Sequence, residues 1–123
     1  MARTSNNRAL GVWMNGIPVG IWSLGANSLH EFRYERSWLD HEQARPISLS
    51  IPLGEREIRG SIVSSFFDNL LPDSTEIRQR IKSRYGASSI SAFDLLAEIG
   101  RDCVGAIQLL PIDKEPAFQE PVE

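Results

Sequence analysis

The sequence predicts an α+β fold, with a curled, mainly antiparallel sheet of about five strands packed against about three helices. Apolar and polar residues alternate through the first half of the chain, as in half-buried strands. Apolar residues then recur at helical spacing from about residue 61, and one more apolar segment follows near the C-terminus. Strands and helices that are segregated along a chain favour this class over alternating βαβ units.

The first three strands are predicted by a hairpin and its continuation. Residues 10–14 and 17–24 are apolar and strand-like, and Asn15-Gly16 lies between them. Both residues of that pair tolerate a positive φ, which is what a tight hairpin turn requires. Residues 29–34 alternate apolar and polar side chains and form the expected third strand.

The next part of the chain is less regular. Residues 35–46 are charged and predict a loop or a short helix that Trp38 and Leu39 would pin to the core. Residues 46–53 alternate strictly between apolar and polar and are flanked by prolines, which predicts a short strand at a sheet edge. A charged loop is expected over residues 54–60.

Three helices and a final strand are expected after residue 60. The first begins near Ser61 and is stopped by Pro72. The second is capped by Asp73 or Ser74 and runs to Tyr85, with Gly86 as its C-terminal cap. The third helix begins near Ser91 and ends at Gly100, and residues 103–110 form the last strand.

The composition is that of one soluble domain. The chain has 123 residues, 41% hydrophobic and 24% charged, close to the averages for globular proteins. No apolar run approaches the ~20 residues of a membrane helix, and the polar N-terminus shows no signal peptide. The single cysteine, Cys103, cannot form an internal disulfide and suits a reducing compartment. A cytoplasmic protein without a membrane partner is therefore expected.

Charge is distributed unevenly along the chain. The net charge is −3, and residues 111–123 alone account for it, so residues 1–110 are neutral. A neutral body lacks the basic field of proteins that bind nucleic acid through phosphates, and no direct nucleic-acid partner is expected. The domain is assigned to residues 10–111, with a flexible N-terminus over 1–9 and a flexible acidic tail over 112–123.

No motif of an enzyme is visible. The chain has neither a dinucleotide fingerprint, nor a phosphate loop, nor a serine nucleophile elbow. His30 and His41 have no metal-ligand spacing, and Cys103 is interpreted as a small buried hydrophobe. We therefore expect no catalytic residue, no cofactor and no metal.

Two features of the chain are candidates for partner binding. Arg78 and Lys82 share one face of a strongly basic helix, which is either a solvated face or a docking face for an acidic partner or a phosphate backbone. A direct nucleic-acid binder that uses this helix is the least favoured alternative. Trp38 lies outside the predicted strands, and it would be an interface anchor if it were exposed.

Three long motifs go further than composition. They are ARPISLSIPL at 44–53, FFDNLLPDS at 66–74 and FDLLAEIGRDCVGA at 93–106, and the opening VWMNG at 12–16 adds to them. In this order and spacing, residues 10–111 resemble the N-terminal subdomain of HipA-type toxin kinases. The resemblance implies the fold of that subdomain.

The resemblance also implies a functional setting. HipA-like proteins are serine/threonine kinases of bacterial toxin–antitoxin systems that phosphorylate aminoacyl-tRNA synthetases and promote persistence, together with a HipB-like DNA-binding partner. Their ATP-binding and catalytic residues lie downstream of the matched subdomain, so none can be assigned here. In split systems a small subunit, HipS, corresponds to this subdomain and neutralises the kinase HipT.

This chain resembles HipS in that respect. The resemblance implies a non-catalytic antitoxin subunit that binds a HipT/HipA-like kinase, with a HipB-like protein in the same complex. The alternative is the N-terminal fragment of a full-length HipA-like kinase, contributing to kinase architecture and HipB contacts. Arg101 and Asp102, inside the longest motif, are further candidate partner-binding residues, and a purely structural turn is the alternative for them.

Overall fold

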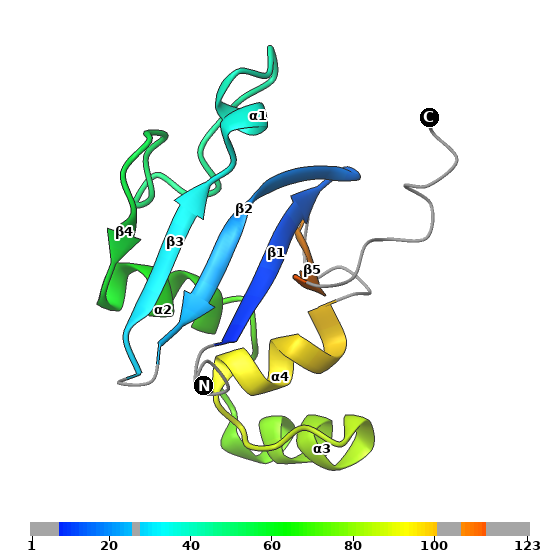
Figure 1. The fold of residues 1–123 in the computed structure, drawn as a ribbon. Coiled ribbons are helices and arrows are strands. Elements are labelled where there is room, and N and C mark those ends of the chain that lie inside the picture. Colours follow the sequence, from blue (N-terminus) through cyan, green and yellow to red (C-terminus); the bar gives the residue numbers. More distant parts are fainter. Residues whose placement is uncertain (1–7, 26–27, 101–106, 113–123) are drawn as a thin grey trace, which may run out of the picture.

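The computed structural model describes residues 8–25, 28–100 and 107–112, and within them it confirms the α+β class. An open antiparallel sheet has the strand order β4-β3-β2-β1-β5 (Figure 1). The strands are β1 (Arg8–Met14), β2 (Ile17–Leu24), β3 (His30–Tyr34), β4 (Ile58–Arg59) and β5 (Ile107–Pro111). The helices are α1 (Arg36–Leu39), α2 (Ser61–Asp68), α3 (Thr75–Tyr85) and α4 (Ala92–Ile99).

The predicted hairpin is confirmed. Asn15 and Gly16 both have positive φ, at 54° and 78°, as the tight turn between β1 and β2 requires. The pairing register shifts between Val12 and Trp13. β1 begins at Arg8, two residues before the predicted start, and these extra residues pair with the end of β2.

The predicted helix ends are also confirmed. Ser74, rather than Asp73, caps α3, because its hydroxyl accepts a hydrogen bond from the Ile77 N–H at 3.2 Å. Gly86 ends the same helix in the left-handed conformation, with φ 73°. Ser91 caps α4. Each cap satisfies a backbone group that the helix itself leaves without a partner.

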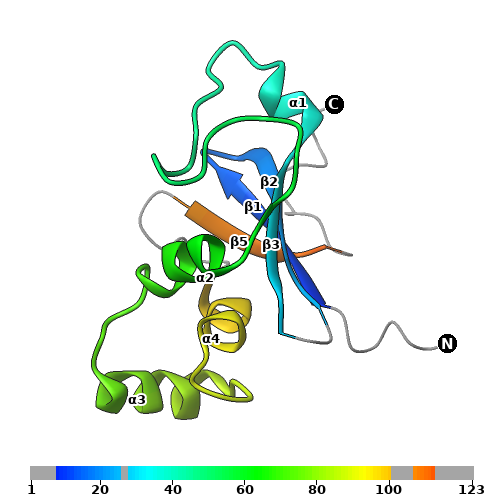
Figure 2. The ribbon, with the colours of Figure 1, turned by 90° about the vertical axis from the view of Figure 1, so that its left-hand side faces the viewer.

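Helices α2, α3 and α4 lie in layers on one side of the sheet, whereas α1 lies beyond the end of β3 (Figure 1 and Figure 2). Figure 2 shows the sheet close to edge-on, with α2 and α4 against one face and α3 beyond them. α2 and α4 each bury an apolar stripe, whereas no residue of α3 is fully buried. The centre of the core is the Trp22 indole, which stacks on Phe67 at a ring-centroid distance of 3.9 Å. None of the described helices is long and apolar enough to cross a membrane.

Two predictions between residues 46 and 60 are wrong. Residues 46–53 form no strand, since only an isolated bridge joins Ser48 to Ile51. Leu49 is 97% exposed whereas Ile51 is fully buried, so the alternating residues do not share one face. The fourth strand is instead β4, inside the predicted charged loop, where Phe32 pairs with Ile58.

Candidate docking site

A concave surface without charged lining residues lies where the segment between α1 and β4 meets α2. We call it the α2 groove. Its volume is ≈ 380 Å³, and no charged side chain lines it. The lining residues are Ser48, Ser50, Ser61, Ile62, Ser65, Phe66, Asn69 and Leu70. This combination of aliphatic and aromatic side chains with neutral hydrogen-bonding groups is suited to binding a protein surface.

The segment beside the groove is held by a buried tyrosine. The Tyr34 hydroxyl donates to the Ile51 carbonyl oxygen and accepts from the Ile47 N–H at 3.0 Å. Burial raises the pKa of Tyr34 above its ordinary value, and the hydrogen bond from Ile47 opposes this shift. The Ile51 N–H also donates to the Ser48 carbonyl at 2.9 Å, which closes a turn around Leu49.

Apolar side chains are exposed around this turn. Besides Leu49, Ile62 on α2 is 48% exposed and Leu53 is exposed to a lesser extent. Exposed apolar residues that gather beside a groove mark interaction sites more often than isolated ones do. Among the described residues that line the groove, the polar groups are serine hydroxyls and the Asn69 amide, which can form hydrogen bonds with a partner.

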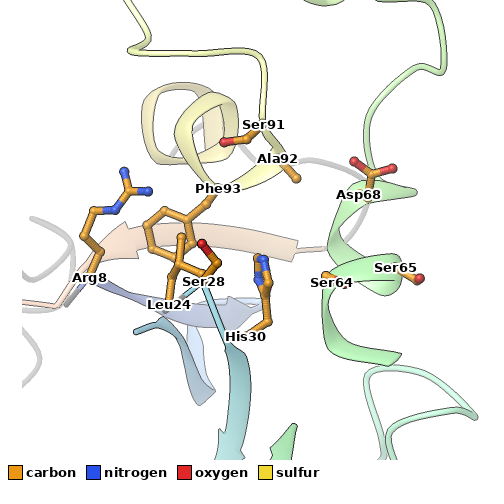
Figure 3. Close-up of a pocket in the computed structure, with 10 residues that line it drawn as sticks. All are labelled: Arg8, Leu24, Ser28, His30, Ser64, Ser65, Asp68, Ser91, Ala92 and Phe93. Carbon is orange, nitrogen blue, oxygen red and sulfur yellow. The ribbon is translucent and has the colours of Figure 1, made fainter. Parts of the chain in front are cut away.

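A second, polar cleft of ≈ 470 Å³ lies between α4 and α2. Figure 3 shows Arg8 and Phe93 on one side of it, Ser64 and Asp68 on the other, and His30 between them. Its charged side chains already have partners, because Arg8 pairs with Asp94 and Asp68 pairs with Arg78. Both Arg8 and Asp68, the charged residues described in the lining of the cleft, are therefore already engaged in ion pairs within the domain.

Asp94 is held in its ionised form. Burial by itself raises the pKa of this carboxyl group. Hydrogen bonds with Ser89, Arg8 and Ser91 and the charge of Arg8 outweigh that effect, and the pKa lies below its ordinary value. The Ser89 hydroxyl donates to Oδ2 at 2.6 Å. The lowered pKa favours the ionised carboxylate, which pairs with Arg8 and so fastens the start of β1 to the first turn of α4. A carboxyl group with a lowered pKa is poorly suited to act as a general acid.

His30 accepts a hydrogen bond that stabilises the fold. The Trp22 indole N–H donates to its Nδ1 at 3.1 Å, and the two rings stack at 5.8 Å. This hydrogen bond requires an unprotonated Nδ1, and burial lowers the pKa of His30 below its ordinary value. The interpretation of His30 as a strand residue without metal-ligand spacing is consistent with this contact.

The pKa of His30 leads to a prediction about acid sensitivity. Since the imidazole is harder to protonate in the fold than in the unfolded chain, the unfolded state binds more protons below about pH 6.5, and stability falls as the pH is lowered through that range. His30→Asn keeps an acceptor for Trp22 and removes the titration. Urea unfolding at pH 7.5 and 5.5 should show a smaller stability loss for the variant, and equal losses would contradict the assignment.

The basic helix α3 is attached to the body by one of its predicted docking residues. Arg78 donates from Nε to the Pro72 carbonyl at 2.7 Å and forms an ion pair with Asp68 at 2.9 Å. Its side chain is only 11% exposed. The contacts of Arg78 therefore hold α3 on the body of the domain, and its guanidinium is not free to bind a partner. The prediction that Arg78 belongs to a docking face is corrected accordingly. Lys82 is half-buried and makes no ion pair within the described part of the chain.

The other residues predicted to bind a partner are Trp38, Arg101 and Asp102. Trp38 is 1% exposed, and its indole N–H donates to the Arg45 carbonyl at 3.0 Å. The expectation of an exposed Trp38 anchor is therefore wrong, because α1 turns the indole into the core. Arg101 and Asp102 lie outside the described residues.

The α2 groove was not predicted. The available signal in the sequence was Leu49, an apolar residue that lies between two serines and two prolines.

No metal centre is found in the region that the structure describes, since no three histidine, cysteine, aspartate or glutamate side chains gather there. This finding concerns residues 8–25, 28–100 and 107–112 alone.

Comparisons with known proteins agree with the sequence resemblance. A family model described as the HipA N-terminal domain matches residues 10–110. A curated protein of Sinorhizobium fredii (strain NBRC 101917 / NGR234), named "Putative kinase Y4mE", is 35% identical over 115 residues. The alignment covers 94% of this chain and 27% of that relative, so the chain spans about a quarter of the relative's length.

Proposed function

Because the chain belongs to the HipA N-terminal domain family, we propose that it is a non-catalytic subunit that binds a HipA/HipT-like serine/threonine kinase and neutralises it. The family match is the observation that supports the proposal. It covers residues 10–110, and the corresponding alignment covers only 27% of the relative named as a putative kinase. The uncharged α2 groove supports it, because it supplies a surface on which a protein partner can dock.

The proposed setting is a bacterial toxin–antitoxin system in the cytoplasm. The kinase would be the toxin, and a HipB-like DNA-binding protein would belong to the same complex without direct contact between this chain and DNA. A domain that packs on a kinase body in a single chain keeps the same complementary surface when it is a separate subunit, so docking between two chains needs no new chemistry.

Co-expression tests the proposal. A HipA/HipT-like kinase from the same genome should arrest growth when it is produced alone, and this chain should restore growth and co-purify with the kinase. A catalytically inactive kinase is the matched control for toxicity, since it should co-purify without any growth defect to relieve. Unchanged toxicity together with no co-purification would reject the proposal.

A second candidate function is favoured by one observation. The chain covers only 27% of the Sinorhizobium fredii relative, so it fits equally the N-terminal part of a longer HipA-like kinase. In that case the same surface would dock within one polypeptide and contribute to kinase architecture and HipB contacts. An in-frame kinase body directly after residue 123 favours this alternative, whereas a separate kinase gene favours the antitoxin subunit.

A further inference from the structure

We propose that Leu49 is the anchor of the docking surface and that it enters an uncharged, apolar pocket on the kinase partner while the α2 groove packs around the pocket's rim. The inference rests on the proposed function, because it names the contact through which such a subunit would bind. It uses only described residues of this chain and the chemistry of their side chains.

Exposure singles out Leu49 from the other apolar residues. It is 97% exposed, whereas Ile62, the next most exposed large hydrophobic residue among those described, is 48% exposed. A leucine side chain that is almost fully exposed contributes almost nothing to the described core, and nearly all of its apolar surface is available to a partner. Covering this apolar surface with a partner pocket would stabilise the complex by the free energy of removing it from water.

The turn that presents Leu49 is already ordered. The Ser48 carbonyl accepts from the Ile51 N–H at 2.9 Å, and the Ser48 hydroxyl accepts from the Ser50 N–H at 3.1 Å. The buried Tyr34 hydroxyl holds the backbone on both sides of the turn. Binding therefore does not have to order this segment, which preserves affinity that a mobile loop would lose.

The chemistry around Leu49 defines the partner. The flanking serines and the residues that line the α2 groove carry no charge. The nearest charged residues along the chain are Arg45, whose guanidinium lies 6.0 Å from the centroid of the Trp38 ring, and Glu55, which pairs with Arg36 at 2.8 Å. A nucleic acid or an acidic protein would require several cations in the groove itself, and none lines it. An apolar pocket with a neutral, hydrogen-bonding rim is the surface that matches this one.

Leu49→Ser tests the inference. The variant should bind the HipA/HipT-like kinase roughly tenfold more weakly or worse in isothermal titration calorimetry, as expected for the loss of an interface anchor. Its folding should be unaffected, because the side chain is almost fully exposed. Leu49→Met should restore binding, and Ile77→Ser, an exposed apolar residue on α3, is the matched control that should bind like the wild type.

Tyr34→Phe tests the presentation of the turn separately. It keeps the ring, which packs edge-on against Phe32 at 4.8 Å, but removes both hydrogen bonds of the hydroxyl. Tyr34 is a positioning residue, so its variant should weaken kinase binding while Leu49 is still present. The entropy of binding should become less favourable, because the turn must then be ordered on association.

The possible outcomes separate the two proposals. If the wild-type chain does not bind the kinase, both the proposed function and this inference are overturned. If the wild type binds and Leu49→Ser binds equally well, the inference fails and the proposed function stands. If light scattering shows a wild-type dimer that Leu49→Ser dissociates, the surface belongs to a second copy of this chain, and the kinase pocket is rejected as its occupant.

Discussion

Replacing Gly20 with alanine is expected to destabilise the fold by about 3 kcal/mol, at the upper end of the range for overpacking a core. A Cβ atom at this position would lie 2.4 Å from Phe32 Cζ and 2.6 Å from the Arg33 carbonyl oxygen. Phe32 is fully buried and the carbonyl belongs to the neighbouring strand β3, so neither can move aside cheaply. The variant should separate β2 from β3 near Tyr34.

Gly54→Ala is the matched control for this prediction. Apart from Gly54 itself and its two neighbours in the chain, no described residue lies within 4 Å of the position that an alanine Cβ would occupy at Gly54, so the same chemical change should shift stability by no more than about 0.5 kcal/mol. Urea unfolding followed by tryptophan fluorescence measures both variants against the wild type. Similar unfolding midpoints for Gly20→Ala and Gly54→Ala would show that the close packing of β2 on β3 does not limit stability.

Much of the fold could be predicted because its signals are local. The Asn15-Gly16 turn and the caps at Ser74, Gly86 and Ser91 depend on backbone conformation and on partners within a few residues. A positive φ at glycine or a serine hydroxyl three residues before an N–H can be recognised in a single sequence. Elements that begin or end at such residues were placed within a few positions.

The segment around Leu49 could not be predicted because its conformation is set by a distant residue. Strict alternation over residues 47–53 is the pattern of a half-buried strand, but Tyr34 binds the backbone at Ile47 and Ile51 from a separate strand. The prolines on either side also remove backbone donors that a strand would use. A tertiary hydrogen bond therefore overrides the local pattern.

The candidate site was predicted poorly for a related reason. The sequence shows which residues carry charge or a large ring, but not which of them are buried. Arg78 is bound to Asp68 and the Pro72 carbonyl, and Trp38 is in the core. Leu49, by contrast, reads as a core residue and is the most exposed large hydrophobic residue described. Exposure depends on the packed fold, so the docking surface became visible only in the structure.

The proposed anchor Leu49 and the core are separate, although the α2 groove beside Leu49 is backed by the core through Phe66 and Leu70. Leu49 makes almost no contribution to the core, whereas Gly20 and Trp22 lie far from the solvent and determine whether the sheet and the helices pack together. Substitutions of Leu49 should weaken binding without changing the free energy of unfolding. Substitutions of Gly20 or Trp22 should lower the free energy of unfolding without changing binding, at temperatures where the variant stays folded. This independence allows function to be tested without unfolding the protein.

Trp22→Ala should have the largest effect of all single substitutions considered, with a loss of about 3–5 kcal/mol in the free energy of unfolding. The fully buried indole stacks on Phe67 of α2 with an interplanar angle of 2° and contacts Phe93 of α4 at a centroid distance of 4.6 Å. One side chain of β2 thus joins both inner helices to the sheet, and its removal leaves a cavity between three elements.

Trp22→Phe separates the two contributions of this residue. Phenylalanine keeps an aromatic ring between Phe67 and Phe93 but loses the hydrogen bond to His30 Nδ1, so a smaller loss is expected. Far-UV circular dichroism during urea unfolding is the suitable measurement, because both substitutions alter tryptophan fluorescence. Since small domains are stable by only about 5–15 kcal/mol, Trp22→Ala should be partly unfolded at 37 °C. A loss below about 1 kcal/mol for Trp22→Ala would mean that α2 and α4 are held on the sheet by contacts other than this aromatic stack.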